Sequence, residues 1–348
     1  MGRKLHVRRT IMTFKKIGFA CKISSLDPKK GIVSIPEFNS KSTTISWLNR
    51  QSRDVAVEKL WDLMKYNIEA VKQAVTWIGN LEENLRMFRL SSEMFPAYTE
   101  SNWSWFWKQS DVQAYAERHL KTVGDIARQR NVRLSFHPGQ YTVLASANPN
   151  IVNKSIEEFE YHVDLARWMG HGKEFQDFKI NVHIAGKAGI QGIRAALTRL
   201  SPEARNTITI ENEEISYGLD DCLQLSDVVP IVLDIHHHFI REGEYIQRTD
   251  PRIQSIIRSW RGVRPVIHYS ISREDLLVEH SPDVLPDLNT LLESGFNKQK
   301  LRAHSDFMWS NSVNEWAATH WEWADVMVEA KGKNLASFKL FESWKNLQ

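Results

Sequence analysis

Short apolar segments alternate along the chain with longer segments in which apolar residues recur at helical spacing. Eight of the short segments are mostly hydrophobic throughout and end in polar residues or glycine, which is typical of strands buried in a parallel sheet. They lie at 16–21, 85–92, 132–139, 179–186, 207–214, 230–238, 264–270 and 324–330. The pattern predicts eight strands.

The longer segments at 56–80, 112–131 and 152–170 predict helices, and the last ends in Gly170, the residue type expected just past a helix. Strands that alternate with helices over most of the chain favour the α/β class and a single (β/α)8 TIM barrel over residues 16–348, with a doubly wound open sheet as the alternative. No GxGxxG motif follows the first strand and no Walker A loop is present, so no nucleotide cofactor is expected.

The composition indicates what kind of protein this is and in which compartment it is expected. With 42% hydrophobic residues and no apolar run long enough for a bilayer, the chain is expected to form a globular core away from membranes. The net charge of +3 permits nucleic-acid binding without arguing for it. Cys21 and Cys222 fit a reducing compartment, which suggests an intracellular location, cytoplasmic in a prokaryote or virus and nuclear in a eukaryote. Residues 1–15 are basic without the apolar core of a secretory signal and are interpreted as a tail.

Histidines and carboxylates mark the ends of six consecutive predicted strands, from the third to the eighth. They are His137, His183, Glu211, Asp234 with the triplet 236–238, His268 and Glu329, and His304 lies in the connection before the last strand. A single histidine or glutamate at a strand end is usually solvated or hydrogen-bonded. In a barrel, however, all these ends open onto one mouth, where so many ionisable groups would be costly to bury unless cations neutralised them.

The donor set indicates a cluster of metal ions rather than a single one. Three protein ligands are enough for one catalytic metal, so about eight candidates suggest two or three ions. Imidazoles and carboxylates without thiolates suit Mn²⁺, Zn²⁺ or Fe²⁺ better than Mg²⁺ or Ca²⁺. Clustered divalent ions are suited to hydrolysis of a phosphate ester.

Seven motifs in one order resemble those of the UV damage endonuclease family, a relative of the endonuclease IV type of DNA-repair nuclease. The motifs are FRLSSEMFP (88–96), LSFHPGQYTVLAS (134–146), VHIAGKAG (182–189), ITIENEEISY (208–217), LDIHHH (233–238), VIHYS (266–270) and DVMVEAKGK (325–333). The resemblance extends from about Lys16 to Lys333. It implies a TIM barrel that binds damaged double-stranded DNA, and the protein is expected to act as a monomer.

The resemblance also implies an activity and a set of site residues. Such enzymes nick DNA on the 5′ side of cyclobutane pyrimidine dimers and 6-4 photoproducts, leaving a 3′-hydroxyl and a 5′-phosphate, and some act on abasic sites. The implied metal ligands are His137, His183, Glu211, Asp234, His237, His268, His304 and Glu329. Glu211, Asp234, His268 and Glu329 are expected to be catalytic, and Mn²⁺ is the usual metal, with Zn²⁺, Fe²⁺ or Co²⁺ as alternatives. The family pattern Asp-x-x-His selects His237, which leaves His236 and His238 as candidates for contacts to ligands or phosphate.

Other residues are assigned to DNA or depart from the family. Gln140 and Tyr141 are implied to probe the duplex beside the lesion, which suits a planar amide and an aromatic ring, although Tyr141 could be a core residue. Phe19 replaces a tyrosine that is frequent in relatives and is expected to retain a stacking role. Val266 occupies a position where many relatives have lysine, so no lysine is expected near the metals.

Some alternatives stay open. Trp103, Trp105 and Trp107 could stack on bases, but packing beneath a loop is preferred. Lys187 and Arg241 could bind phosphate. An abasic-site endonuclease, a metal-dependent sugar isomerase and a damage-recognition protein that does not cut are the rival functions.

Overall fold

Eight parallel strands form one sheet in the computed structural model, which describes residues 14–345. The predicted basic tail therefore lies almost entirely outside the described residues. The order of strands in the sheet is β8-β7-β6-β5-β4-β1-β10-β9. Their bounds are β1 Ile17–Ala20, β4 Met87–Arg89, β5 Arg133–Phe136, β6 Lys179–His183, β7 Ile208–Glu211, β8 Ile231–Val232, β9 Val266–Tyr269 and β10 Asp325–Val328.

The two outer strands of this order, β8 and β9, meet and close the sheet into a barrel. The amide of His268 donates a 3.0 Å hydrogen bond to the carbonyl of Leu233, and Asp234 forms a parallel bridge with His268. The predicted TIM barrel is confirmed, and the open doubly wound sheet is excluded. Two predicted metal ligands thus lie at the seam that closes the barrel.

The sixth strand is shorter than the sequence predicts. It was expected over 230–238 but ends at Val232, because α9 (Ile235–Glu242) begins three residues later. Asp234 caps this helix: its Oδ1 accepts hydrogen bonds from the amides of His236 and His237, at 2.8 and 2.7 Å. The histidine triplet therefore occupies the first turn of a helix, and the cap fixes the position of Asp234.

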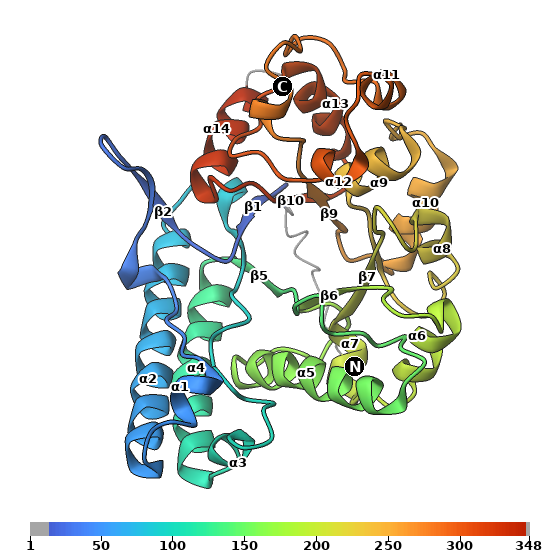
Figure 1. The fold of residues 1–348 in the computed structure, drawn as a ribbon. Helices are drawn as coiled ribbons and strands as arrows, with labels where there is room; N and C mark the ends of the chain where they lie inside the picture. Colours follow the sequence, from blue (N-terminus) through green and yellow to red (C-terminus); the bar gives the residue numbers. More distant parts are fainter. Residues whose placement is uncertain (1–13, 346–348) are drawn as a thin grey trace, which may run out of the picture.

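Helices surround the barrel, as Figure 1 shows. The three predicted helices are present as α2, α4 and α5, and Gly170 follows α5 with a left-handed φ of 82°. The outer helices are α2 Arg53–Ile78, α4 Ser110–Gln129, α5 Pro149–Trp168, α6 Gly189–Leu197, α7 Pro202–Thr207, α8 Leu219–Leu223, α10 Pro251–Ser259, α13 Asn311–His320 and α14 Asn334–Lys345.

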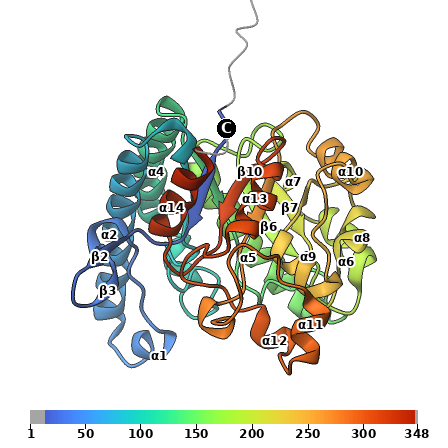
Figure 2. The same cartoon turned by 90° about the horizontal axis from the view of Figure 1, so that it is seen from above.

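Short elements in the connections build up one end of the barrel. The β2–β3 hairpin, α1, α11 and α12 are spread over the side to which the strands point (Figure 2). The bounds are β2 Ser24–Asp27, β3 Gly31–Ser34, η1 Pro36–Phe38, α1 Ile45–Leu48, η2 Glu83–Leu85, α3 Ser104–Trp107, η3 Glu274–Leu276, α11 Leu288–Glu293 and α12 Lys298–Leu301. The irregular segments 22–44 and 271–305 thus frame the mouth.

The barrel interior is polar at its centre. Successive side chains of a strand point to opposite faces, and on β6 the residues Lys179, Asn181 and His183 share the inner face. Thr209 Oγ1 donates to Asn181 Oδ1 at 2.7 Å, and Asn181 in turn donates to Glu211. Buried polar groups need such partners, so this part of the core is organised around hydrogen bonds rather than apolar packing.

Phe19 faces the other layer, between the sheet and the helices. It has no exposed surface, and its ring lies 5.1 Å from that of Phe88 and 6.2 Å from that of Phe338 in α14. A ring that is enclosed in this way offers no face to a base. The prediction that Phe19 stacks against DNA is therefore wrong, and the residue belongs to the core.

The tryptophan cluster packs as preferred. Trp107 is 1% exposed and stacks on Phe95 at 4.8 Å, while buried Trp103 donates from Nε1 to Asn49 at 2.8 Å. Trp105 is half-buried beneath the guanidinium of Arg53. Within residues 14–345, no helix has the length and apolar character needed to cross a membrane.

Candidate metal centre

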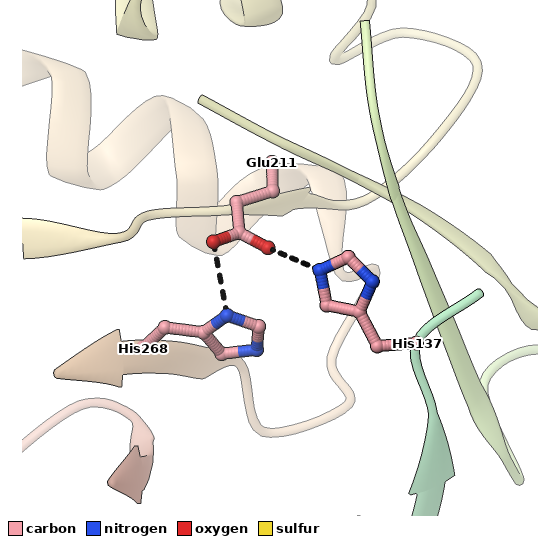
Figure 3. A group of neighbouring side chains, drawn as sticks. All are labelled: His137, Glu211 and His268. Carbon is pink, nitrogen blue, oxygen red and sulfur yellow. Dashed lines mark hydrogen bonds and ion pairs between the residues drawn. The ribbon is translucent and has the colours of Figure 1, made fainter. Parts of the chain in front are cut away.

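Glu211 at the end of β7 is the centre of the site. Its carboxylate is 1% exposed, and the ring nitrogens of four histidines approach it. His268 lies 3.0 Å and His137 3.3 Å from its oxygens, as Figure 3 shows. His183 and His237 lie farther, at 3.9 and 3.7 Å. His137 directly follows β5, and the other side chains come from strands β6, β7 and β9 and from helix α9, so the site exists only because the barrel brings these elements together.

Asp234 and Glu329 extend the cluster on its other side. Nδ1 of His268 lies 3.3 Å from Glu329, and Nδ1 of His237 lies 3.7 Å from Oδ2 of Asp234. Three groups of side chains each bring three donor atoms within 4.8 Å of one another. They are His137 with Glu211 and His268, His183 with Glu211 and His237, and Asp234 with His268 and Glu329.

His304 lies at the margin of these groups. Its ring centroid is 6.5 Å from that of His237 and 6.1 Å from that of His236. An antiparallel bridge to Ser272 holds it in position. Seven of the eight side chains predicted as ligands therefore form the three groups, and His304 lies beside them.

The surroundings shift the pKa values of the carboxyl groups in opposite directions. Burial opposes ionisation of Glu211, yet the imidazoles of His268 and His183 hold its pKa well below the ordinary value. Burial raises the pKa of Asp234 well above the ordinary value, and Glu211 adds repulsion. The pKa values of the two carboxyl groups are thus shifted in opposite directions, so that Glu211 is favoured as a carboxylate and Asp234 in its protonated form.

The histidines are mostly held neutral. Burial lowers the pKa of His268 to about 4 and also lowers the pKa values of His183 and His304. Burial has the same tendency at His237, but the carboxylates of Asp234, Glu211 and Glu214 raise its pKa to about 9. Neutral imidazole is the form that binds metal.

These residues fit divalent cations. Oδ2 of Asp234 is fully buried and has no hydrogen-bond partner, and Nδ1 of His183 is also buried without a partner. Orphaned acceptors of this kind are costly in a protein interior. Each of the two residues belongs to a group of donors that could hold an ion, and a set of nitrogen and oxygen donors without sulfur suits Mn²⁺, Zn²⁺ or Fe²⁺.

A lysine does lie beside the site, which corrects the expectation drawn from Val266. Lys179 at the start of β6 is 2% exposed, and its Nζ lies 2.9 Å from Nε2 of His268. Burial lowers its pKa to about 7. The signal was in the sequence, because Lys179 lies four residues before His183 in one strand and strand alternation places both on the same face.

Two further contacts were missed from the sequence. Arg89 of β4 pairs with Glu329, and both side chains are largely buried. Glu214, three residues after Glu211, lies 3.7 Å from Nε2 of His237. Both residues lie in recognised motifs, but a motif does not specify which side chain of another element each of them contacts.

His236 and His238 do not reach the surface. His238 is 1% exposed, and its Nε2 lies 2.9 Å from Glu244. His236 is 4% exposed. The suggestion that they contact phosphate is therefore wrong. Of the triplet, only His237 faces Glu211 and Asp234.

Gln140 and Tyr141 follow His137 in an anchored loop. Both are exposed, and Tyr141 donates from its hydroxyl to Glu158 of α5 at 3.3 Å. The loop is held by the amide of Val143, which donates to Ser155 at 2.8 Å. The side chains of Gln140 and Tyr141 are thus exposed on a loop that hydrogen bonds hold in place just after the predicted metal ligand His137.

Basic side chains are exposed near the mouth. Lys187 is exposed in the loop after β6. Arg241 lines a cleft of about 660 Å³ together with Lys298 and Arg302. A phosphate-binding role for Lys187 and Arg241 stays a prediction.

Comparison with solved structures supports the barrel. A crystal structure titled SacUVDE superposes with a TM-score of 0.67 and 22% identity, covering 95% of this chain and 98% of that one. Endonuclease IV from Thermus thermophilus superposes with a TM-score of 0.51 and 12% identity, covering 96% and 100%. At these identities the likeness establishes the fold.

Sequence comparison establishes the family. A UV-damage endonuclease from Schizosaccharomyces pombe is 27% identical over 338 residues, which cover 93% of this chain. The chain spans about half the length of that relative, since the match covers 50% of it. The family model described as UV-endonuclease UvdE matches residues 15–348. The chain therefore belongs to the UvdE family of UV endonucleases.

Proposed function

We propose that this chain is a metal-dependent DNA-repair endonuclease that nicks double-stranded DNA on the 5′ side of UV photoproducts and leaves a 3′-hydroxyl and a 5′-phosphate. The observation that carries the proposal is the convergence of four imidazoles on one buried carboxylate, Glu211, at the mouth of the barrel. Membership of a family whose curated relative is named a UV-damage endonuclease supplies the substrate.

The eight predicted ligands would hold two or three divalent ions, for which Mn²⁺ is the proposed metal. Bound ions of this kind lower the pKa of water and neutralise charge on a phosphate and its leaving oxygen. The protein holds the side chains of the proposed ligands in place. The α9 cap fixes Asp234, and Glu211 is held by Asn181 and His268.

Other residues would select the substrate. Exposed Gln140 and Tyr141 are proposed to occupy the gap left by unstacked, damaged bases. Glu158 and Ser155 hold their loop against α5. Damaged DNA is easier to bend than intact DNA, so recognition of distortion would admit several photoproducts.

A plasmid-nicking assay tests the proposal. Supercoiled plasmid, irradiated with UV or left untreated, is incubated with the protein and either Mn²⁺ or EDTA. Nicking should be confined to irradiated plasmid and should require Mn²⁺. Equal nicking of both plasmids, or none with any divalent metal, would contradict the proposal. A plasmid that carries abasic sites but no photoproducts shows whether the abasic-site alternative applies.

A pair of matched substitutions assigns the activity to the site. Asp234→Asn removes the charge of a proposed ligand but keeps an oxygen that caps α9. Asp250→Asn makes the same change at the cap of α10, in a helix outside the cluster. The first variant should lose nicking and the second should retain it. Equal activity of both variants would remove Asp234 from the proposed centre.

A further inference from the structure

Glu214 is a buried carboxylate that lies in the motif at 208–217 but is not one of the eight proposed ligands. It follows β7 by three residues, and its side chain is 9% exposed. Oε1 accepts a 2.8 Å hydrogen bond from Arg302, whose own side chain is 38% exposed. Oε2 is directed toward His237 and lies 3.7 Å from its Nε2. An exposed arginine alone does not explain why the carboxylate is buried, because partly exposed ion pairs contribute little stability.

The hydrogen bond of His237 decides which of its nitrogens faces Glu214. Nδ1 lies 3.1 Å from the backbone carbonyl of Asn212, and a carbonyl can only accept. In the neutral ring that binds metal, Nδ1 therefore carries the proton, and Nε2 is the nitrogen with a lone pair for the ion. A metal-binding histidine usually donates its other ring N–H to a backbone carbonyl in this way.

The separation of the two donor atoms suits one shared ion. Donors about 2.1 Å from a divalent ion lie roughly 3.0–3.6 Å apart, and Nε2 of His237 and Oε2 of Glu214 are 3.7 Å apart, so a small closing movement would let both bind one ion. The His304 ring lies on the same side of the cluster, with its centroid 6.5 Å from that of His237. Glu214 also lines the cleft of about 660 Å³.

We propose that Glu214 is a ninth metal ligand, which binds an ion together with Nε2 of His237 and with His304. This inference rests on the proposed function, since it assumes a metal centre at the mouth. In this arrangement Glu214 is the carboxylate ligand of the ion nearest His304. Glu211, Asp234 and Glu329 would bind the other ions. Arg302 orients Glu214 through Oε1 and leaves Oε2 for the ion.

Metal content of Glu214→Gln tests the proposal without relying on activity. Glutamine keeps an oxygen that can accept from Arg302, so the fold should be retained. Glu242→Gln is the control, because Glu242 lines the same cleft but pairs with Arg241 and has 47% of its side chain exposed. Each protein is saturated with Mn²⁺, passed over a desalting column, and analysed for ions per chain by inductively coupled plasma mass spectrometry.

Glu214→Gln should hold one ion fewer per chain than the unsubstituted protein, and Glu242→Gln should hold the same number. The rise in melting temperature on addition of Mn²⁺ should also be smaller for Glu214→Gln, a comparison that stays valid even if the variant is less stable. Equal ion content and equal thermal shifts in all three proteins would overturn the role of Glu214. An unsubstituted protein that binds no Mn²⁺ would overturn the proposed function itself, and with it this inference.

Discussion

Replacing Lys179 by methionine tests whether the buried amine serves the site at the expense of stability. Burial lowers the pKa of Lys179 from 10.5 to about 7. At pH 7.5 the unfolded chain therefore binds a proton that the folded chain largely lacks, and holding the amine neutral costs the folded state about 4 kcal/mol. Methionine has a similar length and carries no charge, so it removes this cost.

The substitution has an opposing effect at His268. Nε2 of this ring, 2.9 Å from the amine, would lose its partner, and an unsatisfied buried polar group costs about 1–3 kcal/mol. We therefore expect Lys179→Met to increase the free energy of unfolding of EDTA-treated protein by about 1–3 kcal/mol at pH 7.5. Loss of the group that orients a metal-binding histidine should weaken Mn²⁺ binding by about 10–100-fold.

The pH dependence has a definite sign. Because the folded pKa is depressed, the unfolded state binds more protons between pH 7 and 10.5, and stability rises with pH across that window. Lys179→Met should lack this contribution. Lys16, whose pKa burial lowers to about 8, should preserve a smaller rise in both proteins.

Urea unfolding at pH 7.5 and 9.5, followed by circular dichroism, measures the stability, and Mn²⁺ titration measures the affinity. Substitution of the exposed Lys339 by methionine is the control and should change neither. A Lys179→Met variant that is less stable at pH 7.5 and binds Mn²⁺ normally would refute the reasoning, because the amine would then be a structural cation.

Two further predictions concern other parts of the chain. Tyr141→Phe should bind irradiated duplex like the unsubstituted protein in a fluorescence-anisotropy titration, whereas Tyr141→Ala should lose about 1–3 kcal/mol of stacking; equal binding of both would remove the ring from the interface. His320 in α13 is held neutral, because burial lowers its pKa to about 4 while Nε2 donates to the carbonyl of Ile246 and Nδ1 accepts from Trp323. Unfolded histidine binds protons below about pH 6.5, so the free energy of unfolding falls as the pH decreases. In urea unfolding, His320→Gln should reduce the decrease in this free energy between pH 7.5 and 5.5 by about 1 kcal/mol. An unchanged difference would show that folding does not lower the pKa of His320.

The fold was predictable because parallel strands buried on both faces leave continuous apolar runs. The same strands predicted the site, since six of them end in a histidine or carboxylate and a barrel brings all the ends to one mouth. β8 was predicted too long because Asp234 caps a helix, a role that an apolar pattern does not reveal.

The side-chain directions were harder to predict. Phe19 was assigned to DNA by its motif position, but it packs against Phe338 of α14, which is distant in the sequence. The lysine was expected only at the family position on β9, which is Val266 in this chain, whereas the amine of Lys179 reaches His268 from β6. Both errors concern partners on other elements, which only the folded chain identifies.

The most direct test of the central claim uses a duplex of defined sequence with one cyclobutane thymine dimer and an end label on the damaged strand. With Mn²⁺, the protein should produce a single fragment that ends immediately 5′ of the dimer in a 3′-hydroxyl, which a DNA polymerase can extend. No fragment should form in EDTA, with Asp234→Asn, or from the undamaged duplex. Cleavage that ignores the dimer, or the same fragment without any divalent metal, would contradict the account.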